Sequence, residues 1–126
     1  MSLLFTLFFS SVIALAMIHI VALKFFLYWK YFWLDIPMHI FGGITCALGF
    51  VICLSRNKLT TAWYTSLWGY LSFTFFIGIA WELFEVTSGF SIIDEHFVSD
   101  TITDLSMDIL GGVIGYAIVN TIRKLE

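Results

Sequence analysis

Carboxylate and imidazole side chains recur in pairs, three or four residues apart, in three separate segments of this chain. The pairs are Asp35 with His39, Glu82 with Glu85, and Asp104 with Asp108. Residues at these spacings share one face of an α-helix, so each pair presents two titratable groups in one direction. Clustered carboxylates with an imidazole are suitable ligands for a divalent ion such as Mg²⁺, Mn²⁺, Ca²⁺, Zn²⁺ or Fe²⁺. The two glutamates could in addition serve as general bases.

These charged groups belong to a very apolar chain. Of the 126 residues, 60% are hydrophobic and only 12% are charged, and the mean hydropathy is +0.97. Soluble domains carry about 25% charged residues, whereas long uncharged runs are typical of membrane spans. We therefore expect a single integral membrane domain that covers residues 1–126. The chain has no basic patch, which excludes nucleic acid as a partner.

The apolar runs predict an all-α bundle of four transmembrane helices. A helix needs about 20 residues to cross the bilayer core. The fourth uncharged run, residues 109–120, is too short for this, so its helix must begin near Asp100, with Ser99 as its N-cap. That start carries Asp104 and Asp108 into the membrane. The predicted spans are residues 2–23, 33–54, 61–86 and 100–122.

Charge predicts how this bundle is oriented. With four spans, both termini and the loop between the second and third spans lie on one face. That face carries four of the six basic residues and is cytoplasmic by the positive-inside rule. Eight of the nine acidic residues lie toward the opposite face, so the three pairs meet at one level in the outer leaflet. The basic residues of the predicted cytoplasmic face are Arg56, Lys58, Arg123 and Lys124.

Carboxylates at this depth need a compensating partner. An unpaired aspartate near the middle of a span costs about 3 kcal/mol on insertion scales. Glu82, Asp104 and Asp108 together would cost on the order of 10 kcal/mol, comparable to the stability of a whole domain. No Lys or Arg lies within the predicted spans. Three explanations stay open: a divalent cation held by the six paired residues, carboxyl groups that share protons, or ion pairing and water.

Small residues follow two of the acidic positions. The spacings Gly43 to Ala47 and Gly111 to Gly115 each leave a strip on which another helix can approach closely. We interpret these strips as a contact between the second and fourth spans beneath the acidic groups. The same strips could instead hold a homodimer, or join the protein to a larger membrane complex.

The acidic pairs lie in the segments "DIPMHIFGG", "WELFE" and "DLSMDILGGVIGY". In order and spacing these segments resemble motifs of VanZ-like membrane proteins and of related proteins of the YjdF type. The resemblance implies a small polytopic protein of a bacterial or archaeal cytoplasmic membrane, in a family with some members linked to glycopeptide-antibiotic resistance. The matching positions are Asp35, His39, Glu82, Glu85, Asp104, Asp108, Gly111 and Gly115.

This chain departs from the VanZ pattern in three respects. Glu85 stands where glutamine is usual, Asp108 stands where asparagine is common, and no arginine precedes the final aspartates. These departures make the site more acidic and favour a bound cation over the resistance role.

Two functions of different classes follow. The first is a metal-dependent hydrolase or transferase that acts on a lipid-linked substrate, with Glu82 or Glu85 as the general base. The second is non-catalytic: a component of proton- or cation-coupled transport, or an accessory subunit. Because the cytoplasmic halves of the spans carry no charge, we expect a cavity open on one side rather than a channel.

Overall fold

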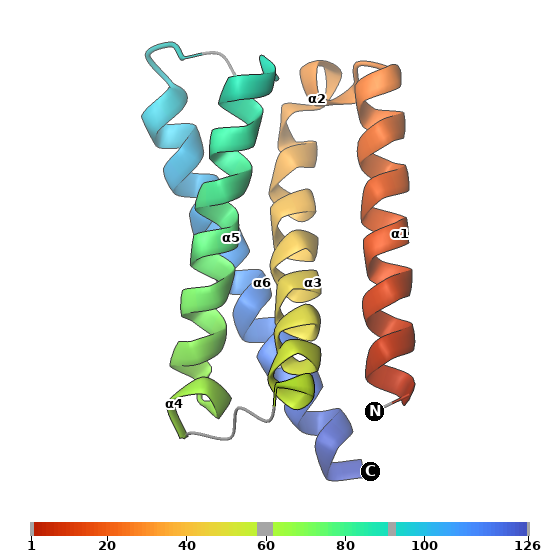
Figure 1. The fold of residues 1–126 in the computed structure, drawn as a ribbon. Coiled ribbons are helices and arrows are strands. Elements are labelled where there is room, and N and C mark those ends of the chain that lie inside the picture. The colour runs from red at the N-terminus through yellow and green to blue at the C-terminus, as the bar shows by residue number, and fades with distance from the viewer. Residues whose placement is uncertain (1, 58–61, 91–92, 126) are drawn as a thin grey trace.

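The computed structural model describes residues 2–57, 62–90 and 93–125, and in this part of the chain every regular element is helical. Short helices connect the long ones at each end of the bundle (Figure 1). The elements are α1 (Ser2–Lys24), α2 (Leu27–Lys30), η1 (Phe32–Leu34), α3 (Asp35–Arg56), α4 (Ala62–Thr65), α5 (Leu67–Ser88) and α6 (Phe97–Leu125).

Four helices are long and apolar enough to cross a membrane, as the apolar runs predict. This result is consistent with an integral membrane protein and confirms the all-α, four-span architecture for the described residues. Both ends of the chain lie at the same end of the bundle (Figure 1). The candidate spans are Leu3–Lys24, Phe32–Arg56, Leu67–Ser88 and Phe97–Leu125.

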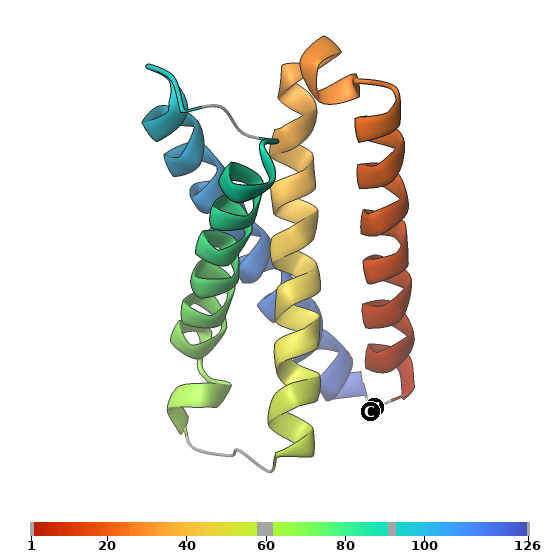
Figure 2. The same cartoon turned by 45° about the horizontal axis from the view of Figure 1, so that its top comes forward.

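The last helix begins earlier than the sequence suggested. α6 starts at Phe97, and the prediction that Ser99 is its N-cap is wrong, because Ser99 lies inside the first turn. Asp94 organises the loop before the helix: its carboxylate accepts a hydrogen bond of 2.8 Å from the backbone N–H of His96, which forms an Asx turn. With 29 residues, α6 is about 44 Å long, and it crosses obliquely behind α3 and α5 (Figure 2).

The glycine strips of α3 and α6 face each other, as the sequence predicted. A Cβ atom added to Gly43 would collide with the backbone oxygen of Asp108 and lie 2.9 Å from the Cα of Gly111. A Cβ atom added to Gly115 would lie 2.5 Å from the Cβ of Ala47. The two backbones therefore touch, and this contact fixes the depth at which α6 meets α3.

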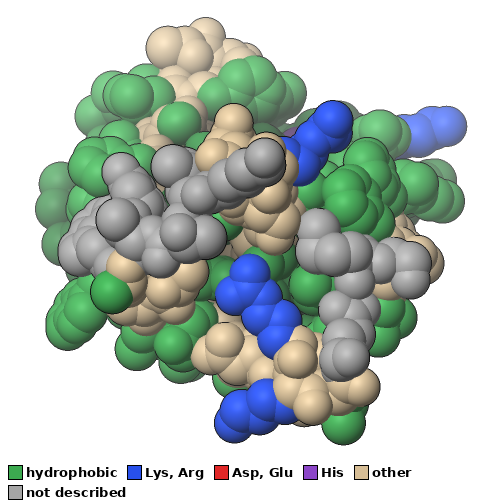
Figure 3. Space-filling model, turned by 60° about the horizontal axis from the view of Figure 1, so that its bottom comes forward, with side chains coloured by type: hydrophobic (Ala, Val, Ile, Leu, Met, Phe, Trp, Pro, Cys, Tyr) green, Lys and Arg blue, Asp and Glu red, His purple; other side chains and the backbone are tan. Residues whose placement is uncertain are grey.

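The polar and apolar parts of the interior lie at opposite ends of the bundle. Near the end that carries α4, Phe50, Tyr70 and Tyr116 pack ring against ring, with centroids 5.0 Å apart in each contact of Tyr70. On the outer surface of this end, Lys and Arg side chains are visible and Asp and Glu side chains are not (Figure 3). The buried acidic residues, Glu82, Asp104 and Asp108, lie in the other half of the bundle.

α1 is the most loosely attached of the long helices. It packs mainly on α3 and makes few contacts with α5, from which it stands apart in both ribbon views (Figures 1 and 2). Only 6% of its most apolar window is buried inside the protein. The face of α3 between α1 and α5 is consequently left uncovered by another helix.

Candidate metal centre

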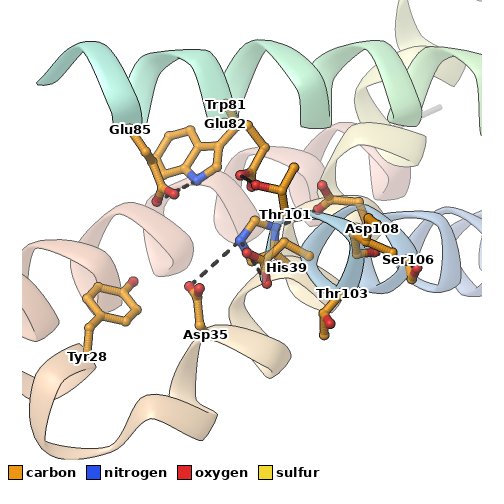
Figure 4. A network of polar contacts seen from close by, with 12 residues as sticks. Tyr28, Asp35, His39, Trp81, Glu82, Glu85, Thr101, Thr103, Ser106 and Asp108 are labelled. Atoms are coloured by element: carbon orange, nitrogen blue, oxygen red, sulfur yellow. Dashed lines mark hydrogen bonds and ion pairs between the residues drawn. The ribbon is translucent and has the colours of Figure 1, made fainter. Parts of the chain in front are cut away.

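His39 is the centre of the polar cluster. Its side chain is buried, with 5% of the residue exposed, and it lies one turn into α3. The Nδ1 atom lies 3.1 Å from the Oδ1 atom of Asp108 on α6. The Nε2 atom faces two other carboxylates, 3.7 Å from Asp35 and 3.9 Å from Asp104 (Figure 4). One imidazole is thus surrounded by carboxylates from α3 and from α6, of which Asp108 lies 69 positions along the chain from His39.

Local sequence explains how α3 contributes. The helix begins at Asp35, where a carboxylate is stabilised by the positive end of the helix dipole. Pro37 lies in the same first turn, where a missing N–H breaks no helical hydrogen bond. His39 follows one turn after Asp35, and Gly43, one turn after His39, leaves room for α6. A Cβ atom at Gly42 would be 3.8 Å from the Oδ1 atom of Asp108.

The two nitrogens of His39 have different surroundings. If Nδ1 carries the proton, it donates a hydrogen bond to Asp108, and the lone pair of Nε2 points toward Asp35 and Asp104. This is the arrangement in which a carboxylate orients a metal-binding histidine. The distances of 3.7 and 3.9 Å exceed the usual length of an N–H···O hydrogen bond. A proton on Nε2 would therefore lack a close acceptor in either carboxylate.

The same gap fits a cation. Two ligand atoms that are each about 2.1 Å from an ion can be at most about 4.2 Å apart, and for Ca²⁺ the limit is nearer 5 Å. The ligand atoms of Asp35, His39 and Asp104 lie within 4.8 Å of one another, which is inside the Ca²⁺ limit, whereas a smaller ion would draw the side chains closer together. The chemistry of this donor set, two carboxylates and one imidazole, suits the divalent ions that the sequence suggested.

Asp108 has a second oxygen that lacks a partner. The residue is 6% exposed, and its Oδ2 atom makes no hydrogen bond to any described residue. This oxygen faces Gly78 of α5, where an added Cβ atom would collide with it. A buried carboxylate oxygen without a donor is uncommon and indicates a missing ligand or water.

Glu82 is held between α5 and α6. It is 7% exposed, and its Oε2 atom accepts a hydrogen bond of 3.0 Å from the hydroxyl of Thr101. The Oε1 atom is buried and has no partner among the described residues. No motif in the sequence singles out Thr101, although its spacing of three and seven residues from Asp104 and Asp108 places it on the same helical face.

Glu85 lies apart from the cluster around His39. Its Oε1 atom accepts a hydrogen bond of 3.0 Å from the indole N–H of Trp81, one turn earlier in α5 (Figure 4). It is only partly buried and lines the cavities beside the cluster. Neither glutamate belongs to the group of residues whose ligand atoms converge, which consists of Asp35, His39 and Asp104.

α1 and α2 add aromatic side chains beside the cluster, and no sequence motif indicates how they contact one another. The Nδ1 atom of His19 lies 2.9 Å from the hydroxyl of Tyr28, and the His19 ring packs edge-on against Trp81. Burial, together with the negative charges of Asp35 and Glu85, raises the pKa of Tyr28 above its ordinary range. The phenol therefore stays protonated and can donate its hydrogen bond to His19.

Two cavities flank the cluster. One, of about 360 Å³, lies between α1, α3 and α5, and the side chains of His39 and Asp108 form part of its wall. The other, of about 310 Å³, lies among the ends of the helices near α2. Four residues line both cavities: His19, Tyr28, Asp35 and Glu85.

The cluster can thus offer a cation three converging ligands, a hydrogen-bonded orienting carboxylate, and two nearby glutamates. A comparison of the chain with protein-family models, curated proteins and solved structures finds no match.

Proposed function

We propose that this protein is an integral membrane protein that binds a divalent cation through Asp35, His39 and Asp104. One observation carries the proposal: the Nε2 atom of buried His39 faces two carboxylates across gaps of 3.7 and 3.9 Å, while its Nδ1 atom is held by Asp108. A cation in that gap would offset the cost of burying Asp104, which is only 3% exposed, and its neighbours.

Asp108 and Glu82 lie beside the proposed ion site and assist it in different ways. The hydrogen bond from Asp108 fixes the imidazole tautomer, and such partners strengthen metal binding by His. The Oε1 atom of Glu82 is buried and has no partner among the described residues, which leaves it free to bind the ion or one of its waters.

The proposed activity is that of a metal-dependent hydrolase or transferase acting on a lipid-linked substrate. A bound divalent ion would supply Lewis-acid chemistry at the cluster. Glu85 is the better placed of the two glutamates to act as general base, because it lines both cavities and Trp81 orients its carboxylate. Glu82 is buried and already bonded to Thr101.

The proposal also includes the orientation of the bundle in the membrane and its relation to known families. The end of the bundle with both termini carries Arg56, Arg123 and Lys124 in the last turns of their helices, so we place it in the cytoplasm and the cluster in the outer leaflet. All three segments that resemble VanZ-like and YjdF-type proteins contribute residues to the cluster region, and on this resemblance we propose kinship with that bacterial and archaeal group.

Elemental analysis of the purified protein tests the metal site. After loading with Mg²⁺, Mn²⁺, Ca²⁺, Zn²⁺ or Fe²⁺ and removal of excess, one of these ions should remain at about one per chain. The variants Asp104→Asn and His39→Ala should lose it, and Glu95→Gln, an exposed acid outside the cluster, should keep it. Retention of the ion by both cluster variants, or its absence from the wild type after every loading, would refute the proposal.

A transport role is the second candidate, and one observation favours it. The hydroxyls of Thr74 and Tyr70 on α5 are buried without a partner among the described residues. They continue, at intervals of four residues, the helical face of Gly78 that meets Asp108. Ion flux into liposomes that is lost in Thr74→Val and Tyr70→Phe, with metal content unchanged, would support this function over the enzymatic one.

A further inference from the structure

The cavity between α1, α3 and α5 is lined by residues of three candidate membrane spans. Its lining on α1 and α5 is mostly apolar and includes Leu15, Ile20 and Ile77. Because α1 makes few contacts with α5, the cavity is bordered on this side by the lipid-facing surfaces of the two helices. Met17 on α1 is 63% exposed and Phe76 on α5 is 67% exposed, so large apolar side chains face outward beside the cavity. A groove in this position is available to a hydrocarbon chain.

The second cavity has a different character. Four carboxylates line it, and none of its described lining residues is Lys or Arg. Aromatic side chains from α2, η1 and α6 stand between these acids, among them Trp29, Phe32 and Phe97. Carboxylates interleaved with aromatic rings attract a cation through Coulomb and cation–π interactions and repel an anion. The lining carboxylates are those of Asp35, Glu85, Asp94 and Asp100.

The two cavities adjoin. His19, Tyr28, Asp35 and Glu85 belong to the walls of both, so the apolar groove and the acidic pocket meet at these side chains, and a ligand that passes them would occupy both. Such a ligand has an apolar part and a polar part, and it passes the wall formed by His39 and Asp108.

We propose that the joined cavities bind a membrane lipid, with one hydrocarbon chain in the groove between α1 and α5 and an ammonium-bearing head in the acidic pocket. The proposal rests on the proposed function in one respect, namely that this lipid is the substrate class of the metal centre. Binding itself needs only the groove and the pocket. Burial of the chain among apolar side chains positions the lipid, and the four carboxylates select its head by charge.

Photo-crosslinking in nanodiscs tests the proposal. The probes are two lipids with the same diazirine-bearing chain, one with an ethanolamine head, which carries an ammonium group, and one with a glycerol head, which does not. Mass spectrometry of the labelled peptides should find the label on groove residues such as Met38 and Ile77. The ethanolamine lipid should label them several-fold more than the glycerol lipid.

Two pairs of variants separate the chain from the head. Ala16→Trp narrows the groove and should reduce labelling by both lipids several-fold, whereas Met17→Trp, at the next position and outside the groove lining, should not. The double variant Asp94→Asn, Asp100→Asn should remove the preference for ethanolamine. Asparagine at position 94 can still accept the hydrogen bond from the backbone N–H of His96, but both positions lose their charge. Glu95→Gln, in the same loop and outside the pocket lining, should keep the preference.

The outcomes also distinguish this proposal from the metal proposal. Metal content should be unchanged in Ala16→Trp, and groove labelling should persist in Asp104→Asn, so either site can fail alone. Equal labelling of groove and exposed helix surfaces would overturn the lipid site. A preference for the glycerol head, or for a glucosyl head with the same chain over ethanolamine, would overturn the assignment of an ammonium group.

Discussion

Asp108 on α6 holds the Nδ1 atom of His39 on α3 at 3.1 Å and thereby decides what the other nitrogen faces. The hydrogen bond turns Nε2 toward Asp35 and Asp104, the two carboxylates that complete the convergent group. The contact also joins the two helices that approach most closely, so the packing of α3 on α6 and the geometry of the cluster depend on each other.

The variant Asp108→Asn tests this relationship. The amide has the same shape but no charge, and it holds the imidazole less firmly in the metal-binding tautomer. We expect metal affinity to fall by about 10- to 100-fold, as it does when such orienting partners are removed. Isothermal titration of the protein in detergent measures the affinity. Asp100→Asn, an acid outside the contacts of His39, is the control, and an unchanged affinity in Asp108→Asn would show that the hydrogen bond does not orient His39.

Neighbouring glycines of α3 should respond in opposite ways to alanine. In Gly43→Ala the new methyl group meets the backbone of Asp108 and Gly111, so the helices must separate, at a cost of about 1–3 kcal/mol. In Gly42→Ala the nearest atom is 3.8 Å away, and the better helix propensity of alanine should stabilise the protein by up to about 1 kcal/mol. Unfolding in detergent, followed by circular dichroism, compares the two. Equal stabilities would contradict the close contact of α3 and α6.

Thr101→Val should destabilise the bundle because it leaves both oxygens of buried Glu82 without a donor. The loss of a partner from a buried acceptor costs about 1–3 kcal/mol. Thr103→Val is the matched control, since the Thr103 hydroxyl bonds only to the carbonyl of Ser99 in its own helix. A difference of less than about 0.5 kcal/mol between the two variants in equilibrium unfolding would place Glu82 in water rather than in the interior.

Tyr28 gives a pH dependence with a definite sign. Burial, then the charges of Asp35 and Glu85, raise its pKa above the ordinary 10.0. The folded protein therefore holds the phenol proton after the unfolded chain has released it, so this contribution to stability is complete below pH 10.0 and declines as the pH rises above it. The stability difference between wild type and Tyr28→Phe should shrink through this range. Tyr31→Phe is the control, and a constant difference would mean that Tyr28 is solvated.

The sequence predicted the elements of the site better than their mutual contacts. Hydropathy located the four spans, and the spacing of Asp104 and Asp108 placed both on the inner face of α6, because helical periodicity is a local property. The glycine strips likewise predicted the contact of α3 with α6, since only small residues allow such an approach.

Contacts that depend on tertiary packing were not predictable. The depth of Glu82, one turn further into the span than Glu85, predicted its burial, but nothing in the sequence predicted its bond to Thr101 or the place of Glu85 beside both cavities. Thr101 and Tyr28 carry no motif, and each becomes significant only because Glu82 or His19 lies opposite. The start of α6 was misplaced because the turn at Asp94 extends the helix into a polar loop, where hydropathy gives no signal.

Phe26, between α1 and α2, has a φ angle of 55° and is the one non-glycine residue of the described chain in the left-handed region. A bulky side chain there costs about 1–2 kcal/mol. The bend between α1 and α2 is thus maintained by tertiary contacts rather than by the conformational preference of Phe26. Relaxation of this bend would let α1 move relative to α3 and α5. The width of the groove between α1 and α5 would then change without any alteration of the carboxylates.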